Sequence, residues 1–430
     1  MTLLIVSQII IAITLLLMVI DKTPMFITAV VGAAAAAFFA GIPLSGSDPV
    51  TMSKLLISGL NPVLIDMCGI LLFIGIMKAS GFLNVIIGDV IRAGNYVGGG
   101  PGIITAASLV AGVIGMMVGF TQAAITGVVA GPAAIKLGVD PDEAAGALQH
   151  ANNLGYGAGF AHPTMVSILA ITGIEFGMFN VWGAVSALAV IGMGYWRMRK
   201  HLRNKGSLKR YSPEEIQTLL ASLTDENTRV DVSSFKAFLP FIILIVASSC
   251  GIPIFVVCFV CSLLVIILSG RNWEQSQSDM IEGVKMIAVP FTATVVFLFL
   301  SGVIKNIGFV ALLDSWFKPV LSFSPELVMF FVASLTGLIT QSYMASAAVV
   351  LPFCTIALGA GGDPMGIAVA AASDCNIGQY YLTGGPVSGL NTVIPVVPGS
   401  DLVKANLFQR PNIAFGFLVG TLVVAYLAVI

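Results

Sequence analysis

The sequence predicts an all-α polytopic membrane protein made of two inverted repeats, each with a re-entrant hairpin and a broken transmembrane helix. Three observations predict this fold. The 430 residues are 57% hydrophobic and only 10% charged, whereas a soluble domain carries roughly 25% charged residues. Apolar runs close to the ~20 residues that a spanning helix needs recur along the whole chain. Finally, the two halves share one uncommon series of polar residues, glycines and prolines.

Each half of the chain has its own set of apolar segments. In the first half they lie at about 2–20, 24–41, 60–78, 102–119, 123–137, 140–173 and 178–197. In the second half they lie at about 237–250, 252–269, 286–301, 325–339, 343–358, 363–398 and 412–430. The first segment has no basic region before it and no small-residue cleavage site, so we expect it to be a retained helix rather than a signal peptide.

A long polar stretch separates the two halves. It runs from about residue 196 to 236 and is rich in Lys and Arg. Within it, Ser212 is followed by Pro-Glu-Glu, which predicts the start of a short surface helix. We therefore divide the chain into a first repeat (1–195), a linker (196–236) and a second repeat (237–430).

The shared series of residues appears once in each repeat. A Thr-Gln pair is followed by a proline, then by Leu-Gly, then by Asp-Pro, and last by an Asn two residues before a Gly. The matched positions are Thr121-Gln122 with Thr340-Gln341, Asp140-Pro141 with Asp363-Pro364, and Asn153 with Asn376. Further upstream, LFIGIMKASGF from Leu72 matches LFLSGVIKNIGF from Leu298. The similarity therefore covers most of each repeat.

Two features of each repeat are unusual for membrane helices. The turns GFTQAA and GLITQSYMA are uncharged and very tight, which predicts re-entrant hairpins at about 102–137 and 325–358. Irregular backbone at membrane depth is tolerated only where it is buried in protein or lines a cavity. The segments at about 140–173 and 363–398 are interrupted near their middle by glycines and a proline: Gly155, Gly157, Gly159 and Pro163 in the first, and Gly378, Gly384, Gly385 and Pro386 in the second. Because Gly costs about 1 and Pro about 3 kcal/mol in a helix interior, these segments predict broken helices.

The distribution of basic residues predicts the topology. Hairpins that return to their own side leave an odd number of crossings in each half, so the second half is inverted relative to the first. Lys and Arg mark the cytoplasmic ends of membrane helices, and the basic linker therefore lies in the cytoplasm. This places both termini in the periplasm of a bacterial inner membrane. Lys305 and Lys318 fall on the opposite side from the other basic residues.

Paired interruptions in inverted halves are the best sequence indication of a transporter's binding site. New helix starts favour an anion, and freed carbonyls favour a cation. The predicted substrate-binding residues are Thr121, Gln122, Asn152, Asn153, Thr164, Thr340, Gln341, Ser342, Asn376 and Ser388. The predicted coupling-ion residues are Asp374, Ser373, Gly155, Gly378 and His150.

Asp374 is the most informative single residue, because a carboxylate within an apolar membrane segment is costly and is a functional hypothesis by default. It could carry a proton, bind a cation, or cap the unwound backbone. His150 and His162 could titrate near neutral pH or pack as neutral core residues. Asp66 has no charged counterpart in the second half, and Glu143 has the position of a first-turn helix charge.

Several classes of function are excluded. The net charge of -1 argues against a nucleic-acid partner. The cysteines are scattered through apolar runs without metal-ligand spacing, and no catalytic motif is present, so we expect no metal, no cofactor and no enzymatic activity. Only Na⁺ or H⁺, as a coupling ion, is expected to bind besides a substrate.

On these hairpins and broken helices the chain resembles the ion-transporter superfamily of elevator-type carriers. That group includes gluconate and citrate permeases, C4-dicarboxylate carriers, divalent-anion/sodium symporters and the large membrane subunits of TRAP transporters. The resemblance implies a scaffold domain that dimerises and a transport domain that slides across the membrane. The hairpin tips read Thr-Gln instead of the Ser-Asn-Thr typical of the sodium-coupled dicarboxylate symporters.

The resulting hypothesis is a secondary transporter for a small organic anion, such as a sugar acid or a di- or tricarboxylate, coupled to H⁺ or Na⁺. Its partners would be that anion, the lipid bilayer and a second copy of the chain in a homodimer. A cation/proton antiporter of the same fold is one alternative. A membrane subunit that requires a binding protein, as in TRAP transporters, is another.

Overall fold

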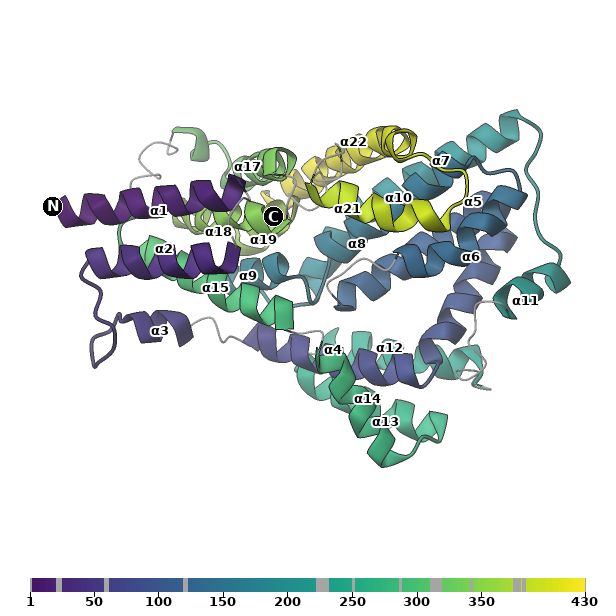
Figure 1. Ribbon diagram of the computed structural model, residues 1–430, viewed down its shortest axis with the longest axis horizontal. Helices are drawn as coiled ribbons and strands as arrows, with labels where there is room; N and C mark the ends of the chain where they lie inside the picture. The colour runs from purple at the N-terminus through teal and green to yellow at the C-terminus, as the bar shows by residue number, and fades with distance from the viewer. Residues whose placement is uncertain are drawn as a thin grey trace.

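The computed structural model describes residues 2–20, 25–57, 62–118, 123–221, 232–249, 252–285, 288–309, 319–340, 343–373, 380 and 384–429. Within these ranges every regular element is a helix, which confirms the predicted all-helical class. Figure 1 shows α1 and α2 side by side at one end, α5, α6, α7 and α10 at the other, and α12, α13 and α14 together along one edge.

The helices of the first half follow the chain without large gaps. They are α1 (Thr2–Ile20), α2 (Met25–Phe39), α3 (Met52–Ile57), α4 (Pro62–Ala79), α5 (Phe82–Val118), α6 (Ala123–Lys136), α7 (Pro141–Gln149), α8 (Ala151–Gly157), α9 (Pro163–Thr172) and α10 (Met178–Asn204). The linker contains α11 (Pro213–Ala221). The second half contains α12 (Ser234–Ser249), α13 (Ile254–Ser269), α14 (Trp273–Val284), α15 (Ala288–Asn306), α17 (Pro325–Thr340), α18 (Tyr343–Gly359), α19 (Pro364–Ala371), α21 (Gly384–Val393) and α22 (Leu402–Leu427).

The helices have the length and surface of membrane helices. In the described part of the chain, 4 helices are long and apolar enough to cross a bilayer: those over Leu3–Ile20, Phe82–Met117, Met178–Asn204 and Leu402–Leu427. Large apolar side chains also lie on the surface, as on α1, where Leu3 and Leu16 are 61% and 58% exposed. Because large contiguous apolar surfaces are unfavourable in water, this is a multi-pass membrane protein.

The polar stretch between the halves begins inside a helix. α10 continues through Asn204, past residue 196, where the predicted linker starts. The guanidinium of Arg197 lies 4.5 Å from the centre of the Phe408 ring, so this charged residue is packed rather than solvated. The predicted surface helix is present as α11. Its first turn is capped by Ser212 Oγ, which accepts from the backbone N–H of Glu215 at 3.2 Å, while Glu215 accepts from the Ser212 N–H.

The first hairpin is preceded by a kink rather than by a separate helix. α5 changes direction at Gly99, which has φ 58° and ψ −133°. A Cβ at this position would lie 2.0 Å from the carbonyl oxygen of Lys209, so only glycine fits. Pro101 lies just after the kink, where its missing N–H costs little because a helix begins there. The hairpin tips, residues 119–122 and 341–342, lie outside the described residues.

The first interrupted segment contains a break in the described structure. The segment at 140–173 divides into α7, α8 and α9, and non-helical backbone connects Gly157 to Pro163. In the second repeat, α19 ends at Ala371 and α21 begins at Gly384. Residues 374–379 and 381–383, between them, lie outside the described residues.

The turn that precedes α7 in the first half resembles the turn that precedes α19 in the second half. Gly138 and Gly361 have φ 92° and 93°. Their N–H groups donate to the carbonyls of Ile135 and Leu358, at 2.8 and 3.0 Å. Two residues later an aspartate caps the next helix, and its backbone angles agree within a few degrees: φ −65°, ψ 132° at Asp140 and φ −64°, ψ 129° at Asp363.

This turn predicts equal costs for alanine in the two repeats. Gly138→Ala and Gly361→Ala should each lower stability by about 1–2 kcal/mol, because an L-residue is strained in the left-handed region. Steric clash adds little, since a Cβ would meet nothing within 3.6 Å at Gly138 and nothing within 4 Å at Gly361. Thermal unfolding in detergent measures the effect. Gly192→Ala is the control, since Gly192 lies in α10 with open space around it; if all three variants were equally stable, the turn would not need glycine.

The two halves exchange helices. α4 of the first half packs against α13 and α14 of the second, while α15 of the second half packs against α2 and α3 of the first. Likewise α9 packs against α18, and α21 against α6. α10 and α22 pack against each other along their length. Each broken helix is therefore held by elements of both halves.

Candidate functional site

The broken helices of the two halves meet at two buried amides. Gln149 ends α7 and Asn152 lies in α8, three residues apart and therefore on one face. Both are buried, with 1% and 3% of their surface exposed. They lie against Gly389 of α21, where a Cβ would stand 2.0 Å from Gln149 Nε2 and 3.0 Å from Asn152 Nδ2. Glycine at position 389 thus permits direct contact between the two broken segments.

These amides have unused hydrogen-bonding groups. In the described chain, neither the nitrogen nor the oxygen of the Gln149 amide has a partner, and the Asn152 oxygen has none. Buried polar groups are nearly always hydrogen-bonded, and each exception calls for an explanation. Leaving such a group unpaired costs about 1–3 kcal/mol. The contact therefore offers an uncharged donor and two acceptors at a place where a purely structural role would favour apolar side chains.

His150 lies on another side of the same junction. Asn412 of α22 accepts a hydrogen bond from Arg197 at its Oδ1, at 3.0 Å. A guanidinium can only donate, so this contact fixes the orientation of the Asn412 amide. Its Nδ2 must then donate to His150 Nε2, 2.9 Å away. His150 is therefore neutral and carries its proton on Nδ1.

The Arg197–Asn412–His150 chain ties the junction of α7 and α8 to α10 and α22. The His150 ring also packs on Gly194 of α10, where a Cβ would lie 3.2 Å from the ring. Successive helical residues point about 100° apart, so His150 faces α10 and α22 while Gln149 faces α21. The structure thus places this predicted coupling-ion residue in a packed network. Its Nδ1 is buried and has no partner in the described chain.

Removing the central member of this network should destabilise the protein. In Asn412→Leu, Arg197 loses an acceptor and His150 loses its donor. We expect a loss of about 1–3 kcal/mol, the usual cost of leaving a buried polar group unpaired. The thermal midpoint in detergent measures it. Thr421→Val is the matched control on α22, because Thr421 bonds only to the carbonyl of Phe417 in its own helix; equal midpoints for the two variants would show that the network carries no stability.

Ser373 follows α19 at the position equivalent to His150. Its hydroxyl donates to the carbonyl of Phe330 at 3.1 Å and lies 3.0 Å from the hydroxyl of Ser334. A cavity of about 10 Å³ adjoins Ser373 and Ser186. A cavity of that size holds one water at most. Ser373 and Ser186 therefore contribute hydroxyl groups to a very small, mostly apolar space between α10, α17 and α22.

Arg410 of α22 reaches the second interruption. Its Nε donates to the carbonyl of Tyr380 at 3.2 Å and to Asn406 Oδ1 at 3.2 Å. The guanidinium also lies 5.9 Å from the centre of the Tyr380 ring. Tyr380 lies between the two undescribed parts of the second broken helix. The positively charged guanidinium of Arg410 therefore lies beside the backbone of Tyr380.

The remaining predicted residues divide into three groups. Asn153 and Thr164 are fully buried, on α8 and α9. Gly155 serves close packing, since its Cβ would lie 3.3 Å from Cα of Gly115 on α5. Thr340 is the last residue of α17, and Ser388 lies in α21, where only its backbone is described. The predicted residues outside the described chain are Thr121, Gln122, Gln341, Ser342, Asp374, Asn376 and Gly378.

Other charged residues have structural partners. Asp66 Oδ1 accepts from the N–H of Phe255 at 3.0 Å and so caps the start of α13. Glu143 Oε1 lies 3.0 Å from Nδ1 of His201. Among the described residues, no group of three His, Cys, Asp or Glu could hold a metal ion. A cavity of about 360 Å³ lies elsewhere, between α4, α13 and α14, and is not lined by α7, α8, α9, α19 or α21.

Sequence reasoning missed Gln149, Arg197 and Asn412. A signal for two of them was available. Gln149 opens the polar run Gln-His-Ala-Asn-Asn within an apolar segment. Asn412 ends a series of polar residues three apart, Asn406, Gln409 and Asn412, which form one fully buried stripe on α22. Such spacing predicts one polar helix face, which in a membrane helix indicates a buried partner.

Comparison with known proteins adds two solved structures. One is of MtrF from Neisseria gonorrhoeae, described as illuminating a class of antimetabolite efflux pumps; it covers 95% of this chain and 96% of its own, with a TM-score of 0.64 and 14% identity. The other is of the YdaH transporter of Alcanivorax borkumensis, described as having an unusual topology; it covers 98% of both chains, with a TM-score of 0.58 and 12% identity.

No protein-family model and no curated protein matches the sequence. Both solved structures are of transporters, but neither comparison shows the ion-transporter superfamily that the sequence resembles. At 14% and 12% identity the likeness establishes the fold alone. The chain is a multi-pass helical membrane protein that shares, over nearly its whole length, the fold of the MtrF and YdaH transporters.

Proposed function

We propose that this protein is a secondary transporter that moves a small organic anion across the bacterial inner membrane by an elevator mechanism coupled to H⁺ or Na⁺. The observation that carries the proposal is the contact of Gln149 and Asn152 with Gly389. Transporters built from inverted repeats bind their substrates where the broken helices of the two halves meet, near the bilayer midplane. The likeness to MtrF and YdaH agrees with a transport function.

Two further features support an inverted repeat. At both Gly138 and Gly361 the glycine N–H donates to the carbonyl three residues earlier, and an aspartate two residues later caps the next helix by accepting a backbone N–H, from Asp142 in one half and from Gly366 in the other. The exchange of α4 and α15 between the halves is the pattern that a two-fold axis between two repeats would produce. In this arrangement the linker is cytoplasmic, both termini are periplasmic, and the protein works as a homodimer.

The chemistry of the contact suits an anion that also carries hydroxyl or amide groups. α9 begins with Pro163 and has no side-chain cap at its start, so its first N–H groups favour a carboxylate. Arg410 adds a positive charge at the second interruption. The amides of Gln149 and Asn152 can both donate to and accept from hydroxyl groups. A sugar acid or a hydroxylated di- or tricarboxylate presents such groups together.

The experiment that tests this function combines binding and transport. The purified protein is screened by thermal shift against sugar acids, di- and tricarboxylates and antimetabolites, with and without Na⁺. Acids that stabilise it are then followed in proteoliposomes under H⁺ and Na⁺ gradients. We expect one group of acids to stabilise the protein and to be transported. Proton exchange for a cation without any organic substrate would instead establish the antiporter, and transport that begins only when a binding protein is added would establish the subunit.

Asp374 provides a test of coupling, although it lies outside the described residues. A carboxylate at membrane depth can carry a proton or bind Na⁺. Asp374→Asn should therefore abolish uphill accumulation, while substrate still exchanges down its own gradient. Uptake is measured in proteoliposomes at several pH values and Na⁺ concentrations. Uphill uptake with unchanged dependence on both ions would make Asp374 a backbone cap.

A further inference from the structure

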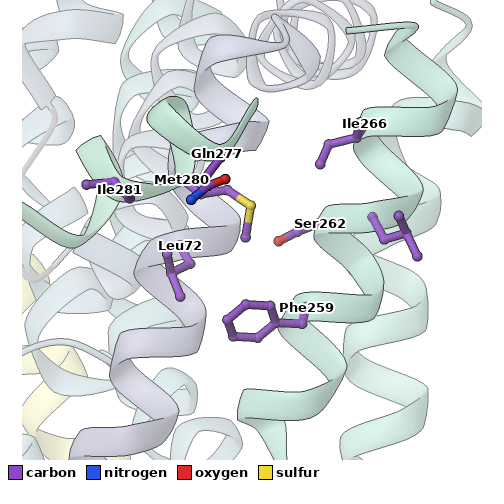
Figure 2. Close-up of a pocket in the computed structure, with 8 residues that line it drawn as sticks. Leu72, Phe259, Ser262, Ile266, Gln277, Met280 and Ile281 are labelled. Carbon is purple, nitrogen blue, oxygen red and sulfur yellow. The ribbon is translucent and has the colours of Figure 1, made fainter. Parts of the chain in front are cut away.

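An apolar groove lies between α4, α13 and α14. Its volume is about 360 Å³. Figure 2 shows Phe259 and Ser262 of α13 directed toward Leu72 of α4 and Met280 of α14, with Gln277 and Ile266 at the same end of the groove. Ser262 donates its hydroxyl to the carbonyl of Cys258 at 2.7 Å. The walls are therefore apolar over most of their length, and Gln277 is a polar group at one end.

α4 and α14 cannot move closer together to close the groove. α4 and α14 touch at Gly75 and Gly283, where a Cβ on Gly283 would lie 2.1 Å from the carbonyl oxygen of Leu71. A Cβ on Gly75 would likewise lie 2.4 Å from the carbonyl oxygen of Asp279. This backbone contact sets how closely the two helices can approach each other. The space beside the contact stays open between the helices, and because protein interiors are close-packed, another molecule is expected to fill it.

The groove opens on the surface that faces the membrane. Phe259 and Leu263 line it and are 42% and 45% exposed, and Ile267 further along α13 is 61% exposed. In a multi-pass protein, such an apolar helix face contacts lipid chains rather than water. Whatever enters the groove from this side comes from the hydrocarbon layer.

One end of the groove has the features of the membrane surface. Trp273 begins α14 and is 63% exposed, and Trp is enriched at the level of lipid head groups. Next to it, Arg271 donates to the carbonyl of Ala79 at 2.7 Å and to Asp279 at 2.6 Å. The Arg271 side chain is 29% exposed, so part of its charged group reaches the surface at this end of the groove.

We infer that this groove binds one acyl chain of a membrane phospholipid, with the head group beside Arg271 and Trp273. The occupant is an acyl chain because the groove is apolar over most of its length and opens toward the hydrocarbon layer, with Arg271 and Trp273 where the head group would lie. The volume of the groove falls within the range of ~300–1,000 Å³ that is typical of mostly apolar ligand sites with a few polar groups.

The wild-type protein gives the first test. It is reconstituted with a phosphatidylglycerol that carries a photoactivatable diazirine in its acyl chain, illuminated, digested and analysed by mass spectrometry. We expect the label on groove residues of α13 and α14 well above the label on the exposed apolar residues of α1. Equal labelling of α1 and α13 would overturn the inference, since it would show only the general lipid layer.

A pair of tryptophan variants gives the second test. Leu263→Trp fills the groove, whereas Val260→Trp lies on the same helix, is 55% exposed in the wild type and does not line the groove. Native mass spectrometry should find co-purified phospholipid on the wild type and on Val260→Trp, but not on Leu263→Trp. Retained lipid on a folded Leu263→Trp variant, or a disulfide between two copies of Leu263→Cys, would contradict the proposed occupant. Both readouts measure binding and do not depend on transport.

Discussion

Replacing Gln149 with leucine should strongly reduce transport at low substrate concentration and leave the protein at least as stable as the wild type. The amide of Gln149 is buried, and neither of its polar atoms has a partner in the described chain. Leucine has a similar shape and removes this desolvation penalty of about 1–3 kcal/mol. If the amide forms a hydrogen bond with a charged substrate group, its removal weakens substrate binding by about 1.5–3 kcal/mol. The transport rate at low substrate concentration then falls roughly 10- to 150-fold.

Thermal unfolding and proteoliposome uptake, measured on the same preparation, test both halves of this expectation. Gln409→Leu is the matched control, because Gln409 is also fully buried but donates to the carbonyl of Gly146 at 3.0 Å. We expect that variant to be less stable and to transport in proportion to its folded fraction. A Gln149→Leu protein that loses stability and keeps its uptake would place Gln149 among the packing residues and would remove the main support for the proposed site.

The local features of the fold could be predicted from sequence because Gly, Pro and Asp act over a few residues. Asp140-Pro141 and Asp363-Pro364 begin helices in the structure, each with the aspartate side chain accepting a backbone N–H. Ser212 likewise caps α11. Such caps depend only on neighbours in the chain. The all-helical class followed in the same way from composition and from the lengths of apolar runs.

The partners of each buried polar residue could not be predicted, because they lie far away in the chain. Periodicity places Gln149 and His150 on different faces of a helix but does not say that one meets Gly389 and the other Asn412. The length of α10 could not be predicted either. In the sequence Arg197 belongs to the polar linker, whereas in the structure it lies within α10 and packs on Phe408. These contacts depend on how the two halves exchange helices, which no local pattern records.

Gly389→Ala should strongly reduce transport, although alanine is the better helix former. The new Cβ would lie 2.0 Å from Gln149 Nε2 and 3.0 Å from Asn152 Nδ2. The amide of Gln149 must therefore leave its position at this contact. A displacement of this size at a binding site can cost about 10²-fold in rate. Stability should change much less, because alanine gains up to about 1 kcal/mol of helix propensity and Gln149 is a flexible side chain.

Gly192→Ala, in open space on α10, is the control for uptake and should transport like the wild type. The double variant Gly389→Ala with Gln149→Leu separates the site from general damage. Substitutions that act on one contact are not additive. If Gln149 and Gly389 belong to the same substrate site, the double variant should transport no worse than the more impaired single variant. Losses that multiply would show two independent defects, and wild-type uptake by Gly389→Ala would show that this contact does not bind the substrate.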